Sequence, residues 1–109
     1  MQPPSRCLAV PTRPDAVFCA NDLLAMGAID ALRKEVGLQV PRDALVAGFD
    51  DIPAASWAAY DLTTFVQDGA RMVDDAMAIP SASAESHKPV GDLRVIVPAR
   101  LVERGTTRR

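Results

Sequence analysis

The sequence is poor in aromatic residues and has no long apolar run. Its 109 residues include three phenylalanines, one tyrosine and one tryptophan, so a core has to be built from aliphatic side chains. No apolar stretch approaches the roughly 20 residues of a membrane-spanning helix. The start of the chain, "MQPPSRCLAVPTRPDA", is rich in proline and arginine and lacks the apolar middle of a signal peptide. These absences predict a cytoplasmic globular chain with no membrane partner.

Neither sign of charge is in clear excess. Twelve Lys and Arg stand against 14 Asp and Glu, a net charge of −2, whereas nucleic-acid binding usually needs a basic patch. Cys7 and Cys19 form no CxxC pair, which favours a reduced compartment, and Cys19 is expected to be a small buried hydrophobe. The single histidine, His87, lies in a serine-rich stretch and is expected to be solvated rather than a ligand or a base.

Known catalytic motifs are absent as well. The chain contains neither a GxGxxG nor a GxxxxGK[ST] phosphate loop, no GxSxG motif, and no His or Cys cluster with zinc spacing. The adjacent carboxylates Asp50 and Asp51 follow an extended stretch, where neighbouring side chains point to opposite faces, so they make a poor acid–base pair. The sequence therefore predicts no enzyme, no cofactor and no metal site.

What the chain does contain is an alternation of apolar strands and amphipathic helices. Continuous apolar runs are typical of strands buried on both faces, and an alternating run is typical of an edge strand. The expected strands are 16–21, 45–49, 62–67 and 93–97, with a further short run over 99–105; the expected helices are 21–37, a short one after Pro53, and 68–79, followed by a polar loop over 80–92. This order predicts an α/β fold, with an open, mostly parallel sheet and flanking helices.

The helix over 21–37 shows the clearest periodicity. Either Asn21 or Asp22 is a natural N-cap, and Gly37 follows the last periodic residue, where a left-handed C-cap belongs. Apolar residues recur at the spacing of a single helical stripe. The residues expected to be buried along it are Ala25, Ile29, Leu32 and Val36.

Polar residues follow the first two expected strands at the point where each one ends. Asn21 and Asp22 follow the first strand, and Asp50 and Asp51 follow the second. In open parallel sheets ligands bind outside the carboxyl ends of the strands, and amide and carboxylate groups suit a ligand with several hydroxyls, such as a sugar. The alternative is that such residues only cap the helices that follow. Asp22 and Asp51 are expected to be helix caps near the cleft, whereas Asn21 and Asp50 are candidate ligand contacts.

The only tryptophan, Trp57, falls in the short helix expected after "DDIP". An aromatic ring beside a polar crevice can stack on a sugar, which makes Trp57 a third candidate ligand contact. The same ring can equally pack against the sheet or against a partner subunit.

Four motifs follow one another at characteristic separations. They are "CANDLLAMGA", "VPRDALVAGFDDIP", "LTTFVQ" and "PARLVERGTT". In this order they resemble the C-terminal part of the lactose/galactose-repressor family of bacterial transcriptional regulators, over 14–79 and 93–107. Asp61 departs from the family pattern, which has a proline before "LTT", and "VQDGARMV" lacks the proline often found after the glutamine.

The resemblance implies a periplasmic-binding-protein-like effector domain. In this family a small molecule, often a sugar or a nucleobase, binds between two lobes and changes the affinity for DNA. The motif positions place effector contacts on Asn21 and Asp50. The implied organisation is an irregular segment over 1–13 and a partial C-terminal lobe over 14–109, with neither the helix-turn-helix headpiece nor the facing lobe.

The same resemblance gives expectations about partners. The chain is expected to form a homodimer, to need an absent headpiece for DNA binding, and to bind its effector weakly or not at all. An alternative interpretation is a fragment of an extracytoplasmic sugar-binding protein that serves a transporter. The sequence upstream would discriminate the two, because a helix-turn-helix favours the regulator and a signal sequence favours the transporter component. A third interpretation, an enzyme fragment, is disfavoured by the missing catalytic groups.

Overall fold

The computed structural model describes residues 13–87, 89, 91 and 93–109. Cys7 and all but the last residue of the segment expected to be irregular, 1–13, lie outside the described residues. The domain boundary expected after this segment therefore stays a prediction.

The chain divides by its contacts into two compact units. The first comprises Met1–Val66 and Arg100–Arg109, and the second comprises Gln67–Ala99. Every candidate ligand contact and every candidate cap belongs to the first unit. The candidate site is therefore a property of that unit alone.

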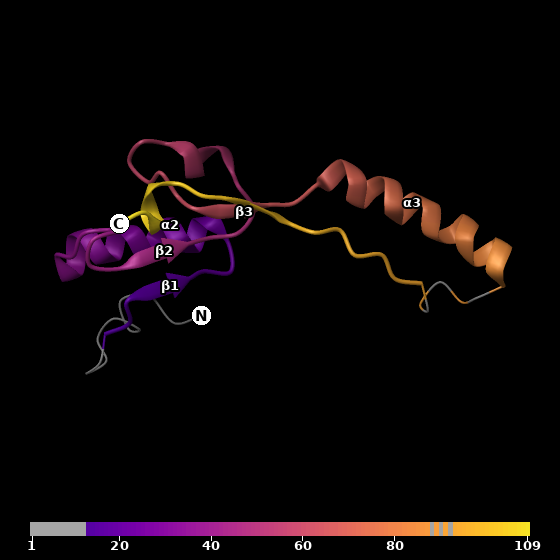
Figure 1. Cartoon of the computed structure of the whole chain (residues 1–109), viewed down its shortest axis with the longest axis horizontal. Helices are drawn as coiled ribbons and strands as arrows, with labels where there is room; N and C mark the ends of the chain where they lie inside the picture. Colours follow the sequence, from indigo (N-terminus) through magenta and orange to yellow (C-terminus); the bar gives the residue numbers. More distant parts are fainter. Residues whose placement is uncertain (1–12, 88, 90, 92) are drawn as a thin grey trace. The chain divides into compact units, whose positions relative to one another are not determined.

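Two parallel strands form the centre of the first unit. β1 (Ala16–Phe18) pairs with β2 (Leu45–Ala47), with Val17 opposite Val46. Figure 1 shows these strands side by side, with helix α2 (Asp22–Ala31) providing the connection between them. Both strands fall inside runs that the sequence predicts to be strands, and their parallel pairing through a helical crossover is confirmed.

A second pair of strands extends this arrangement. β3 (Thr64–Val66) pairs antiparallel with β4 (Arg100–Val102). Single parallel bridges, from Ala47 to Thr63 and from Asp50 to Val66, join the β2 segment to the β3 segment. The first three strands therefore run parallel and β4 runs against them, which confirms the prediction of an α/β fold with a mostly parallel sheet.

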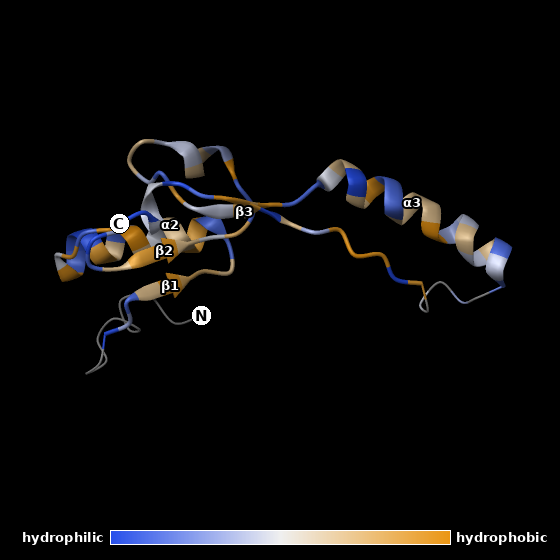
Figure 2. Cartoon of the chain, in the orientation of Figure 1, coloured by the Kyte–Doolittle hydropathy of each residue, from blue (hydrophilic) through white to orange (hydrophobic). Residues whose placement is uncertain are grey.

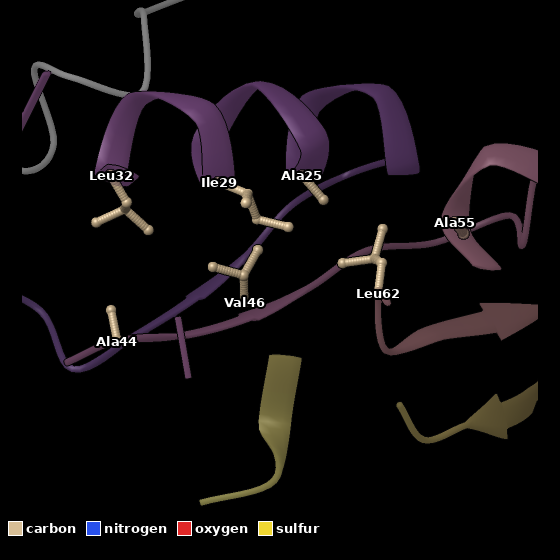
Figure 3. Packing of buried hydrophobic residues seen from close by; sticks show 7 residues of the cluster. All are labelled: Ala25, Ile29, Leu32, Ala44, Val46, Ala55 and Leu62. Carbon is tan, nitrogen blue, oxygen red and sulfur yellow. The ribbon is translucent and has the colours of Figure 1, made fainter. Parts of the chain in front are cut away.

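The core of the first unit lies between α2 and β2. Figure 3 shows Ala25, Ile29 and Leu32 on the side of the helix that points toward Val46. These three residues are buried, so the predicted burial is confirmed for three of the four residues of the stripe. The buried cluster consists of Ala25, Ile29, Leu32, Ala44, Val46, Ala55 and Leu62.

The buried stripe ends one turn earlier than its spacing predicts. At Leu32 the helix changes to a π-helical turn, Leu32–Val36, which ends at Gly37 with φ 74°. A π turn advances through a smaller angle per residue than an α turn, so Val36 is carried off the stripe and is 39% exposed. The left-handed C-cap expected at Gly37 is confirmed.

The helix expected after Pro53 is a single 3-10 turn, η2 (Pro53–Ser56), rather than two or three turns. The chain turns toward β3 directly afterwards, and the Ala55 carbonyl accepts a hydrogen bond from Leu62 N at 2.8 Å instead of continuing a helix. Trp57 therefore lies just outside the helix that was expected to contain it.

The second unit contains a helix longer than the sequence predicts. α3 (Gly69–Ser86) is capped by Asp68, whose carboxylate accepts from Arg71 N at 3.0 Å, and it continues through Pro80. Proline lacks only its own N–H, so the residues after it remain able to donate helical bonds, and the loop predicted from Pro80 onward is wrong as far as Ser86. No residue of α3 is buried, and Figure 2 shows polar and apolar residues mixed along it. Among the described helices none is both long and apolar enough to cross a membrane.

The strand predicted over 93–97 is also wrong. Residues 93–99 have no regular secondary structure, and the next apolar run, predicted over 99–105, supplies β4. An alternating pattern makes a strand only where a neighbour accepts and donates its backbone hydrogen bonds. Within the described chain β3 offers that neighbour to Arg100–Val102.

Candidate functional site

Asn21 and Asp50 lie at one edge of the sheet. β1 and β2 are parallel neighbours, so their carboxyl ends meet at this edge. Asp22 N donates to the Phe49 carbonyl at 3.0 Å, which directly joins the two segments that leave the strands. The two polar pairs therefore share one edge, as expected where the strands that precede them are parallel neighbours.

Asn21 is the cap of α2. Its backbone is extended, with φ −153°, and its Oδ1 accepts from Leu24 N at 2.9 Å. The prediction that Asp22 caps this helix is therefore wrong. Because the cap uses Oδ1 of the half-buried Asn21 side chain, Nδ2 is the group that the cap leaves for a ligand.

Asp22 is a buried carboxylate that joins three segments of the first unit. It is fully buried and accepts from Thr64 Oγ1 at 2.6 Å and from Ile52 N at 2.9 Å. It occupies the first turn of α2, where the positive end of the helix dipole stabilises negative charge. Its side chain is bound by β3 and by the turn after β2, which explains why it does not cap its own helix.

Asp51 does not cap a helix either, so that prediction is wrong as well. The N-cap of η2 is Ile52, which makes no side-chain cap bond, and Pro53 at the start of the turn has no N–H to satisfy. The Asp51 carboxylate instead pairs with Arg104, with Oδ1 2.9 Å from Nη2. No sequence signal points to Arg104, because nothing local connects positions 51 and 104.

Asp50 is exposed and adopts an unusual backbone conformation. Its φ is 126°, and its N–H donates to the Phe65 carbonyl at 2.9 Å. A positive φ is uncommon for residues other than glycine, and strained backbone is concentrated at binding and catalytic sites. Exposure, position and strain all fit a ligand contact at Asp50, which stays a prediction.

Trp57 lies on a different segment from the other two candidates. Its side chain is 60% exposed, and its carbonyl accepts from Tyr60 N at 2.9 Å and from Asp61 N at 2.7 Å. None of the hydrogen bonds or ring contacts described for this part of the chain joins it to Asn21 or Asp50. Its role as a ligand contact stays a prediction.

All three phenylalanines gather at the same edge, and none of them is among the residues predicted to form the site. The ring of Phe65 lies 6.0 Å from that of Phe18 and 5.9 Å from that of Phe49. Thr64 points toward Asp22, so its neighbour Phe65 lies on the opposite face of the strand. The sequence signal that they share is that each lies within one of the predicted strands, 16–21, 45–49 and 62–67.

The polar groups and aromatic rings at this edge are of kinds that can contact a ligand. Asp50 offers a carboxylate acceptor and Asn21 an amide donor, beside the phenylalanine rings. Among the described residues no group of His, Cys, Asp and Glu is arranged to hold a metal ion. The arrangement suits an uncharged or cationic ligand that donates hydrogen bonds from hydroxyl or amine groups.

A tyrosine–aspartate pair outside this edge gives a test of the electrostatics. Tyr60, the only tyrosine, donates to Asp30 Oδ2 at 3.2 Å. The pKa of Tyr60 is raised above its ordinary 10.0, mainly by burial and secondly by the negative charge of Asp30. Because the pKa of Tyr60 is higher in the folded than in the unfolded state, this group contributes stability at pH values below the unfolded pKa. The contribution is lost as the pH rises through the folded pKa. We expect Asp30→Asn to lower this pKa but not to normalise it, because burial remains.

Phenolate absorbance during an alkaline titration measures this pKa from a single residue. Asp15→Asn, which neutralises an exposed carboxylate of the same unit, is the matched control and is expected to leave the titration unchanged. Identical titrations of wild type and Asp30→Asn would contradict a role for the Asp30 charge.

Comparison with known proteins finds one matching domain family and a set of similar bacterial repressors. The periplasmic binding protein-like domain family matches residues 2–107. The HTH-type transcriptional repressor PurR of Mannheimia succiniciproducens is 43% identical over 75 residues, and that of Haemophilus influenzae is 44% identical over 75 residues. Each match covers 69% of this chain and 22% of the repressor, so the chain spans about a fifth of the length of these relatives.

Solved structures of bacterial regulators also match the chain. A LacI transcriptional regulator from a Rhodococcus species matches with a TM-score of 0.75 at 31% identity, over 95% of this chain and 37% of that one. The lac repressor dimer bound to operator and the anti-inducer ONPF matches with a TM-score of 0.67 at 34% identity, over 86% of this chain and 28% of that one. The fold is therefore that of part of a periplasmic-binding-protein-like domain.

Proposed function

Because this chain belongs to the periplasmic binding protein-like domain family and matches regulators of the LacI/GalR type, we propose that it is the effector-sensing part of a bacterial transcriptional regulator. The resemblance found in the sequence motifs is confirmed. In the proposed regulator a small molecule binds this domain and controls the binding of DNA by a separate headpiece.

The placement of Asn21 and Asp50 carries the proposal of effector binding. Both follow neighbouring parallel strands, at the edge where ligands of open α/β sheets bind. Asp50 is exposed, and its carboxylate accepts hydrogen bonds from hydroxyl or amine groups. These features favour a sugar-like effector, with Trp57 as a further stacking residue.

We expect Asp50→Ala to weaken effector binding by about ten- to a hundredfold, the usual effect of losing a hydrogen bond to a charged group. The measurement is a titration of the isotopically labelled chain with millimolar monosaccharides and nucleobases, followed by amide chemical shifts. Binding at the proposed site shifts the amides of Asn21 and Asp50 in the wild type.

Asp74→Ala is the matched control for this experiment. Asp74 is an exposed carboxylate of the second unit, and its replacement is expected to leave the titration unchanged. Shifts confined to other parts of the chain, no shift with any compound, or equal affinity in wild type and Asp50→Ala would count against the proposed site.

We also propose a cytoplasmic homodimer. The lac repressor structures that the chain resembles are dimers, and the described residues expose several large apolar side chains, including Trp57, Met77 and Ile96. Light scattering at micromolar concentration is expected to give twice the mass of the chain, and a monomer would contradict the proposal. DNA binding is assigned to a headpiece, so a gel shift with the chain alone is expected to show none.

The regulator is favoured over a transporter's extracytoplasmic sugar-binding protein. The curated relatives that resemble the chain are named as transcriptional repressors, and the order of "GFDD" and "LTT" matches that class. These relatives also support a binding role over a catalytic one.

A further inference from the structure

The turn that presents Asp50 is strained at two consecutive residues. Asp50 has φ 126° and Asp51 has φ 59°, and neither is a glycine. Each such residue costs free energy and persists only where its surroundings hold it in place. The direction of the Asp50 carboxylate therefore depends on what holds this turn.

Three consecutive backbone N–H groups of the turn are held from outside it. Asp50 N donates to the Phe65 carbonyl at 2.9 Å, and Ile52 N donates to Asp22 Oδ2 at 2.9 Å. Asp51 N approaches Thr64 Oγ1 at 3.4 Å, the weakest of the three contacts. The side chain of Asp51 therefore matters most for holding the middle of the turn.

Arg104 supplies the partner of that side chain. Its Nη2 lies 2.9 Å from Asp51 Oδ1, and its Nη1 donates to the Leu62 carbonyl at 2.9 Å. The guanidinium therefore bridges the turn to the segment that leads into β3. Both charged side chains are largely buried, at 18% and 22% exposed, so water screens this pair less than a surface pair.

The backbone of Arg104 is fixed as well. Arg104 N donates to Thr63 Oγ1 at 2.8 Å, and Thr63 Oγ1 lies 3.1 Å from the Arg104 carbonyl. Asp61 holds the next residues, because its carboxylate accepts from Gly105 N at 3.0 Å and its carbonyl from Thr106 N at 3.2 Å. The guanidinium thus projects from a backbone that is anchored on both sides of it.

We infer that Arg104 is the positioning residue of the effector site: its fork holds Asp51, and through the strained turn it fixes the direction of Asp50. The inference rests on the proposed function only in taking Asp50 as an effector contact. The Asp51–Arg104 pair would thereby couple effector binding to the C-terminal segment, because Arg104 lies 53 positions from Asp51.

Hydrogen exchange of the Asp50, Asp51 and Ile52 amides tests the positioning without any ligand. Arg104→Met keeps the length of the stem but removes the fork, and these amides are expected to exchange about tenfold faster than in the wild type. Amides inside α2 report on general unfolding and are expected to change much less. Equal exchange in Arg104→Met and the wild type would overturn the inference, as would a uniform rise across α2 and the turn.

Two comparisons make the test specific. Arg108→Met removes an arginine of the same segment whose pair with Glu103 is exposed, at 63% and 53%, and is expected to leave the turn unchanged. Asp51→Asn weakens the same bond from the other side, because its amide oxygen still accepts but carries no charge, so it replaces Arg104→Met if that variant does not fold. The double variant is expected to exchange no faster than Arg104→Met alone, and additive effects would overturn the inference.

The ligand titration separates this inference from the proposed function. If the monosaccharides and nucleobases shift the Asp50 amide, Arg104→Met is expected to weaken that binding about tenfold, and Arg104→Lys, which keeps the charge but not the fork, by less. If no compound binds while exchange at the turn responds to Arg104→Met, the positioning stands and the proposed effector contact fails. Wild-type affinity in Arg104→Met would overturn the inference.

Discussion

Asp22→Ala is expected to lower the free energy of unfolding of the first unit by about 3 kcal/mol, within the range for breaking a buried charged hydrogen-bond network. The substitution removes the acceptor of Thr64 Oγ1 and of Ile52 N. Thr64 is fully buried, so no water can replace the acceptor that its hydroxyl loses. The Asp22 carboxylate lies against Gly48, so its removal also leaves a void there, which adds to the destabilisation. Chemical denaturation followed by the emission of the single tryptophan measures the effect.

Two variants control for the charge and for the site. Asp15→Ala removes an exposed carboxylate of the same unit and is expected to change the free energy of unfolding by less than about 0.5 kcal/mol. Asp22→Asn keeps the shape but presents an N–H₂ group to one of the two donors, so it is expected to fall between the wild type and Asp22→Ala. If Asp22→Ala were as stable as Asp15→Ala, the buried carboxylate would contribute nothing to the unit.

The same residue shows where sequence reasoning stops. Asn21 and Asp22 are both good caps by composition, and their order along the chain does not distinguish them. The choice is made by Thr64, which lies 42 positions away and binds the Asp22 carboxylate. With Asp22 held by β3, Asn21 is left to cap α2.

The sheet edge, in contrast, could be predicted. Continuous apolar runs with a helix between them predict parallel strands, and parallel strands bring their carboxyl ends to one edge. The burial that such runs also predict is wrong for β1, where Phe18 is 64% exposed. The logic of the pairing needs no knowledge of distant contacts, and it placed Asn21 and Asp50 together correctly. The motif resemblance named the same two residues independently.

The remaining errors concern segments whose partners are not nearby in the sequence. The run over 93–97 alternates like a strand, yet β3 pairs instead with Arg100–Val102. The helix expected after Asp51 predicts that it is a cap, yet Arg104 binds it from 53 positions away. A local pattern states what a segment can form, and the available neighbour decides whether it does.

Gly48 packs closely against α2, and Gly48→Ala is expected to destabilise the first unit by about 2–3 kcal/mol, as overpacking of a tight contact does. A Cβ at this position would lie 2.4 Å from Asp22 Oδ1 and 3.2 Å from both Ala25 Cβ and Asp22 Cα. The carboxylate cannot swing away without losing Thr64 and Ile52, and the helix backbone cannot retreat without opening the core over Val46.

Gly27→Ala is the matched control, with an effect of opposite sign. Gly27 lies within α2, is exposed, and would have no neighbour within 4 Å of a new Cβ. Alanine there is expected to raise the free energy of unfolding by about 0.5–1 kcal/mol, because glycine is a poor helix former. Thermal unfolding followed by circular dichroism ranks the three proteins, with Gly27→Ala highest and Gly48→Ala lowest. A Gly48→Ala protein that unfolds at or above the wild-type temperature would show that α2 and β2 are not in the close contact on which the Asp22 network depends.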